Sequence, residues 1–241
     1  MGIHKQEEKF LKKLEEHFEM YGELDKLCKD GLCYNGELYN NDWNTRSGNE
    51  EELWSKSNRR VLFLMKDPNS NPGEDYREWG WASFRHSTFK IMFAWLKGLS
   101  LVTAKKYPSL EEAYQQYDVQ YPLAIVNIKK ASGGSSVSNN KVWEYAKRDS
   151  LLLKEQVREI LHPNIIVCTG ESGTVLAVAK TFIYDDIEFE KVNEWCYYNA
   201  EKNILLIDSW HPAAIISLEQ KYDNMMKNVQ DFISKHPKLF K

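Results

Sequence analysis

The chain has 241 residues, of which 42% are hydrophobic and 28% are charged, and its formal net charge is −3. This composition is that of an ordinary globular protein with a real core, and it excludes a disordered chain. No apolar run approaches the roughly 20 residues of a membrane-spanning helix. The first residues lack the apolar stretch of a secretory signal, so we expect a soluble, cytoplasmic protein with no membrane partner.

Four cysteines are too few for a disulfide scaffold at this length. Cys28 and Cys33 are separated by four residues, and Cys168 lies inside an apolar run. No set of four ligands with the spacing of a zinc or iron–sulfur site is present. We therefore expect reduced thiols, no metal site and no cofactor.

The N-terminal part of the chain, residues 1–58, is expected to be a helix and an irregular lead-in that packs on the core. Apolar residues recur near helical spacing over residues 5–21, with Glu and Lys between them. Residues 28–58 are rich in Asn, Gly and acidic residues, which favours irregular structure.

The remaining residues, 59–241, contain four short runs that are apolar at nearly every position. The runs are residues 61–65, 123–128, 165–168 and 204–208. Such runs indicate strands buried on both faces, as in a parallel sheet. Helical patterns lie between and after them, at residues 89–99, 149–161 and 218–233. The pattern predicts an α/β fold with a central four-stranded, mainly parallel sheet and helices on both faces, within a single domain.

Polar residues lie at or just after the end of each run. They are Asp67 after the first run, Asn127 in the second, Glu171 or Ser172 after the third, and His211 after the fourth. Ligands in open α/β sheets bind outside the carboxyl ends of the strands. The sequence therefore predicts a site at that edge of the sheet.

Three segments at these strand ends resemble motifs of the uracil-DNA glycosylase superfamily. Residues 61–68 are similar to the motif of an apolar strand and a turn with an acidic or amide residue before Pro. Residues 123–130 resemble the strand whose Asn reads the base, and residues 210–215 resemble the closing His-Pro motif. The likeness extends over about residues 60–216, in the same order along the chain.

The resemblance implies a monomeric hydrolase that cleaves the N-glycosidic bond of uracil or a related damaged base in DNA, without a cofactor. Asp67 would stabilise the cationic sugar and orient water. His211 would donate a hydrogen bond to the departing base, as oxyanion donors do.

The substrate-binding candidates implied by the resemblance lie in or after these strands: Pro68, Asn69, Trp81, Phe84, Asn127, Ser132, Gly133 and Ile215. Asn127 would pair with the edge of a flipped-out base, and Ile215 would act as a wedge in the base stack. Backbone amides of Ser132 and Gly133 would contact phosphates. Spacing leaves open which aromatic residue after Asp67 stacks on the base.

Charge is uneven along the chain. The basic side chains of residues 126–148 are Lys129, Lys130, Lys141, Lys147 and Arg148, against one acidic residue, Glu144. This excess permits a basic surface facing DNA.

Two other functions remain open. One is a catalytically silent nucleic-acid- or nucleotide-binding module on the same fold. The other is a serine hydrolase, since Ser172, Asp208 and His211 occur in the α/β-hydrolase order. However, residues 170–173 do not form the Gly-x-Ser-x-Gly elbow of that fold.

Overall fold

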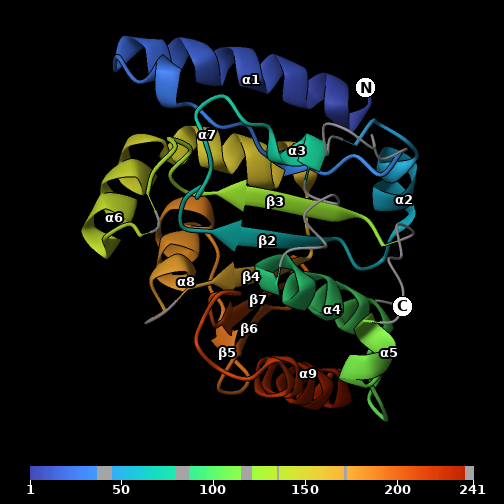
Figure 1. Cartoon of the computed structure of the whole chain (residues 1–241). Coiled ribbons are helices and arrows are strands. Elements are labelled where there is room, and N and C mark those ends of the chain that lie inside the picture. The colour runs from blue at the N-terminus through green and yellow to red at the C-terminus, as the bar shows by residue number, and fades with distance from the viewer. Residues whose placement is uncertain (37–44, 80–86, 115–120, 135, 171–172, 237–241) are drawn as a thin grey trace.

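The sheet of this protein has four parallel strands at its centre. The computed structural model describes residues 1–36, 45–79, 87–114, 121–134, 136–170 and 173–236. Within them, a seven-stranded sheet has the order β1-β3-β2-β4-β7-β6-β5 (Figure 1). The parallel strands are β3 (Leu123–Asn127), β2 (Val61–Met65), β4 (Ile165–Thr169) and β7 (Ile204–Ser209). The predicted α/β class is confirmed.

The expectation of a four-stranded sheet is wrong, because the described sheet is mixed and wider. β1 (Gly31–Leu32) pairs antiparallel with β3 at one edge. At the other edge β6 (Cys196–Asn199) pairs antiparallel with β7, and β5 (Glu190–Lys191) pairs with β6. Two of these strands have two residues and the third has four, which is too short for a period-2 pattern to stand out.

The fully apolar strands are explained by cores on both faces of the sheet. All five residues of β2 are buried. Val61, Phe63 and Met65 belong to one core, whereas Leu62 and Leu64 belong to the other. Side chains alternate across a strand, so burial on both faces requires an apolar residue at every position.

Helices supply the other side of each core. The helices on the face of Val61 and Phe63 are α4 (Ser87–Leu101), α5 (Leu110–Tyr114) and α9 (Leu218–Lys235). The opposite face is covered by α2 (Glu50–Lys56), α6 (Asn139–Arg148), α7 (Ser150–Lys154) and α8 (Thr174–Val178), with the π-helical segments η3 (Glu155–Leu161) and η4 (Ala179–Ile183). The short helix α3 (Tyr76–Trp79) follows β2. No described helix is long and apolar enough to cross a membrane.

The N-terminal helix α1 (Ile3–Met20) packs against η3, outside the helices that cover the second face of the sheet (Figure 1). Its apolar side chains, among them Phe10 and Phe18, form a third cluster with Tyr145 and Ile160. The buried Glu7 carboxylate accepts a hydrogen bond from the backbone N–H of Leu32, at 2.8 Å. Residues 28–58, expected to be irregular, contain β1 and α2.

Candidate active site at the carboxyl ends of the strands

The strand order places a topological switch point beside β2, at the carboxyl ends of the central strands. The chain passes from β2 to β3 on one side and places β4 on the other side of β2. Leu64, Cys168 and Asp208 are in register on β2, β4 and β7. Two inter-strand spacings put Leu64 and Asp208 about 10 Å apart. Asp67 comes three residues after Leu64, and His211 comes three residues after Asp208. The two segments therefore leave the sheet at the same level.

Asp67 lies against a lysine from the next strand end. Its Oδ2 is 3.7 Å from Nζ of Lys129, and the side chains are 12% and 9% exposed. Oδ2 is buried and has no hydrogen-bond partner among the described residues. Burial raises the pKa of Asp67, while the charges of Lys129 and Lys66 oppose this shift. A carboxylate with a raised pKa is a stronger base.

The loop after β3 closes against this pair. Nζ of Lys129 donates hydrogen bonds to the carbonyls of Ala131 and Ser132, at 2.6 and 3.2 Å. A Cβ atom at Gly133 would lie 2.9 Å from Nζ of Lys129 and 3.0 Å from Oδ2 of Asp67. The structure thus brings the predicted Ser132–Gly133 loop to Asp67. However, the backbone N–H of Ser132 donates to the carbonyl of Lys26, so this amide is committed to the protein.

His211 sits in a tightly bonded turn after β7. Its Nδ1 accepts a hydrogen bond from the backbone N–H of Ala213, at 3.1 Å. In the neutral ring this contact leaves the proton on Nε2, which becomes a donor. The carbonyl of Pro212 accepts a hydrogen bond at 2.7 Å from Nζ of Lys221, which is 4% exposed. Burial lowers the pKa of Lys221.

Asn127 is the last residue of β3. It is fully buried, and its Nδ2 donates to Oδ2 of Asp30 at 3.2 Å. Asp30 also receives hydrogen bonds from Lys130 and Gln156. The Nδ2 group of Asn127 therefore belongs to a buried network around Asp30, while its Oδ1 has no hydrogen-bond partner among the described residues.

The other predicted residues are divided between surface, interior and undescribed segments. Pro68 is buried and Asn69 is exposed. Ile215, the expected wedge, is fully exposed in the turn after His211. Trp81, Phe84 and Ser172 lie outside the described residues.

The basic run at residues 126–148 is largely neutralised within the protein. The ion pairs are Lys129–Asp67, Lys130–Asp30, Lys141–Glu144, Arg148–Asp149 and Arg148–Glu23. Such pairing reduces the positive potential that a DNA phosphate would meet. The run is thus not the uncompensated basic surface that the sequence permitted.

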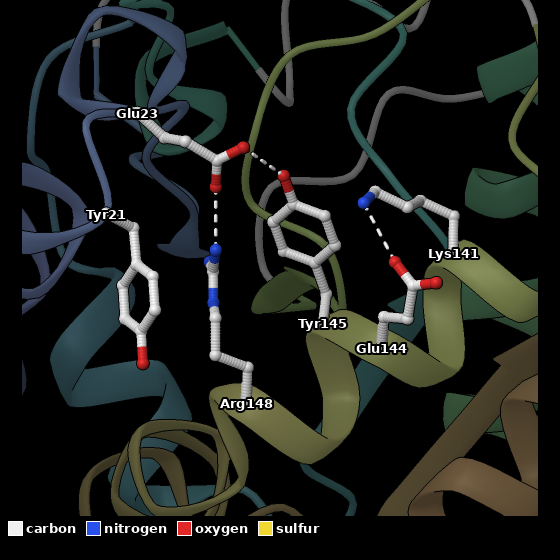
Figure 2. Close-up of a pocket in the computed structure, with 6 residues that line it drawn as sticks. All are labelled: Tyr21, Glu23, Lys141, Glu144, Tyr145 and Arg148. Carbon is white, nitrogen blue, oxygen red and sulfur yellow. Dashed lines mark hydrogen bonds and ion pairs between the residues drawn. The ribbon is translucent and has the colours of Figure 1, made fainter.

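A cavity of about 240 Å³ lies between α6 and the segment after α1. Figure 2 shows the Arg148 guanidinium between the rings of Tyr21 and Tyr145, whose centroids are 4.6 and 4.3 Å from it. Glu23 accepts hydrogen bonds from Arg148 and from the Tyr145 hydroxyl. The charges lining the cavity therefore pair with one another. The Tyr145 ring is also 5.7 Å from Nζ of Lys129, so the cavity adjoins the Asp67 loop.

Residues that could hold a metal ion were sought within the described ranges. No group of three or more His, Cys, Asp or Glu side chains there is placed to hold a metal ion. Cys28 and Cys33 are buried free thiols, and burial raises the pKa of both.

Sequence reasoning missed two buried lysines, Lys129 and Lys221, which hold the loops of Asp67 and His211. In the sequence analysis, Lys129 was considered only as one of the basic residues that could form a surface facing DNA. A signal was present, because Lys129 directly follows the predicted run at residues 123–128, at the edge expected to carry the site. Lys221 lies in a helix and gave no such signal.

Comparison with known proteins finds no matching family model and no matching curated protein.

Proposed function

We propose that this chain is a hydrolase of the uracil-DNA glycosylase type, which cleaves the N-glycosidic bond of uracil or a related damaged base in DNA. The observation that carries the proposal is one pair of groups at one edge of the sheet. A partly buried carboxylate, Asp67, follows β2, and an imidazole with Nδ1 as acceptor, His211, follows β7 at the same level. The motif resemblance over residues 61–68 and 210–215 supports the same conclusion.

Asp67 would act on the sugar side of the bond. When the bond between C1′ and the base nitrogen breaks, its electron pair leaves with the base and positive charge develops on the sugar. A carboxylate nearby stabilises that charge. It also orients a water whose oxygen bonds to C1′ and whose proton passes to Asp67. The raised pKa of Asp67 favours that proton transfer.

His211 would act on the base side. The negative charge of the leaving base collects on its carbonyl oxygen, and a fixed N–H donor stabilises it there. The hydrogen bond from Ala213 to Nδ1 leaves Nε2–H as that donor in the neutral ring. Ile215, four residues later and fully exposed, is the proposed wedge into the base stack.

The role of Asn127 in base recognition stays a prediction. Its Nδ2 donates to Asp30, whereas its Oδ1 is buried and has no hydrogen-bond partner among the described residues. In this proposal that oxygen is the acceptor for the base N–H.

The test is excision of uracil from a labelled oligonucleotide by the full chain, followed by heating in alkali to cleave at the abasic site. We expect wild type to cleave, and Asp67→Asn to be about 10²–10⁴-fold slower. His211→Ala is expected to be about 10²–10³-fold slower. The matched control is Asp208→Asn, because Asp208 is also a carboxyl near the strand end whose pKa is raised by burial. It has no part in the proposed reaction and its variant should cleave like wild type.

Each failure has a distinct reading. An oligonucleotide that is bound but not cleaved by wild type would favour the silent binding module. Labelling of Ser172 by a fluorophosphonate, with loss of labelling in Asp208→Asn, would favour the serine hydrolase.

A further inference from the structure

Lys129 is placed beside Asp67 by the backbone itself. Its N–H donates to the carbonyl of Lys66 at 2.9 Å, which continues the pairing of β3 with β2 beyond the strand ends. The residue after Lys66 is Asp67. The ammonium and the carboxylate are therefore neighbours because of strand register, and their contact does not depend on a surface side chain that happens to reach across.

The ammonium of Lys129 contacts both the loop after β3 and the Asp67 carboxylate. Two hydrogen bonds go to the carbonyls of Ala131 and Ser132, of the three that an ammonium can donate. Its distance of 3.7 Å to Oδ2 of Asp67 is too long for a hydrogen bond, so this contact is electrostatic. A buried ammonium is costly without such compensation.

Gly133 lies close to both Lys129 and Asp67. A Cβ there would come within 2.9 Å of the Lys129 ammonium and 3.0 Å of the Asp67 carboxylate. The absence of a side chain lets the loop approach both charged groups closely. Loop, ammonium and carboxylate thus form one packed unit.

We propose that Lys129 is a positioning residue, which holds the loop of residues 131–133 against Asp67 and supplies the counter-charge of its carboxylate. The reaction that this arrangement serves rests on the proposed function. The effect of Lys129 on the pKa of Asp67 does not rest on the proposed function, and it is measured separately.

The charged groups around Asp67 make the expected effect specific. Lys129 faces it from the end of β3, and Lys66 adds a charge from its own strand end. Beyond Lys129 stands the Tyr145 ring, which Lys141 approaches to 5.4 Å and Lys129 to 5.7 Å. Loss of the Lys129 charge leaves the burial of Asp67 opposed by Lys66 alone, so Asp67 should then protonate at higher pH.

The variant Lys129→Met removes the charge at similar side-chain length, and Lys129→Arg retains it. The matched control is Lys141→Met, which removes a lysine from the same tyrosine ring without touching Asp67. The titration of Asp67 is followed by NMR of the carboxyl carbon in aspartate-labelled protein, and Asp67→Asn identifies the signal. We expect the midpoint to rise by about 1–3 pH units in Lys129→Met. It should change little in Lys129→Arg and stay at the wild-type value in Lys141→Met.

The acid limb of kcat/KM for uracil excision should move with that midpoint. A purely structural role would lower kcat/KM at all pH values and leave the limb in place, which would overturn the counter-charge. An unchanged NMR midpoint in Lys129→Met would overturn it as well. If the midpoint moves but wild type does not excise uracil, the proposed function fails and the counter-charge stands.

Gly133→Ala provides a second measurement if Lys129→Met does not fold. Its added methyl group must displace the ammonium, the carboxylate or the loop. The midpoint of Asp67 should therefore shift in this variant, and an unchanged value would refute the packed unit.

Discussion

Asp30→Asn should destabilise the protein strongly, because it leaves the buried ammonium of Lys130 without a counter-charge. Asp30 and Lys130 are each 2% exposed, and Nζ of Lys130 lies 2.5 Å from Oδ1 of Asp30. This is the one hydrogen bond of that ammonium among the described residues. Removal of one partner of a buried ion pair costs about 3–5 kcal/mol. Such a loss is a large fraction of the roughly 5–15 kcal/mol by which a domain is stable.

Replacement of the other partner, in Lys130→Met, should reduce the free energy of unfolding by less. In Lys130→Met the Asp30 carboxylate keeps hydrogen bonds from the backbone N–H of Asn127, at 2.8 Å, and from Nε2 of Gln156, at 3.0 Å. The double variant should lose less stability than the sum of the single variants, by about 1–3 kcal/mol.

Urea unfolding followed by tryptophan fluorescence measures these differences. Thermal unfolding should show a Tm lower by roughly 6–20 °C for Asp30→Asn, at about 2–4 °C per kcal/mol for a chain of this size. The control is Lys227→Met, since Lys227 is 63% exposed in its ion pair with Asp223 and should have no measurable effect. A loss below about 1 kcal/mol for Asp30→Asn would show that Lys130 reaches water or another carboxylate, and the reasoning would be wrong.

Two further outcomes concern the contacts of α1. Burial lowers the pKa of His4, but its hydrogen bonds to Glu50 and Glu7 raise it to about 9 from 6.5. A raised pKa in the folded state stabilises below the unfolded value, so unfolding free energy should fall by on the order of 2–3 kcal/mol from pH 6.5 to 9. His4→Gln should flatten this slope in urea titrations at fixed pH, and an equal slope would contradict the assignment. Gly31→Ala should destabilise more than Gly22→Ala, which costs about 1–2 kcal/mol. Both glycines have positive φ, but a Cβ at Gly31 would overlap the Glu7 carboxylate whereas Gly22 has open space, so equal Tm values would refute the overlap.

The parallel core of the fold could be predicted because its signal is local. Strands buried on both faces are apolar at every position, and the predicted runs match β2 in full and β3, β4 and β7 to within one residue. The edge strands could not be found in this way. β1 and β5 consist of two residues each, too few to show a periodic pattern, and the partner of β1 lies far along the chain on β3.

The site was predictable in part for the same reason. Asp67 and His211 follow apolar strands directly, so their place at one edge follows from parallel topology. The environment of Asn127 was not predictable, because Asp30 comes from 97 residues earlier. No periodicity or spacing reports on a contact of that kind. The contact of Lys221 is closer in sequence, since the carbonyl of Pro212 lies in the turn nine residues earlier, but a lysine within a helical pattern gives no sign of it.

The short pairing of β1 with β3 also covers an edge at which β3 could pair with another chain. An apolar strand with an open edge is a template for pairing with another chain. Along β3 that edge is closed by residues 28–33: Cys33 donates to the carbonyl of Leu123, the Asp30 carboxylate accepts from Asn127, and Cys28 continues the contact past the strand end. A chain shortened from its N-terminus beyond this segment would uncover an apolar edge. Its first defect should therefore be aggregation, although the segments that carry Asp67 and His211 would still be present.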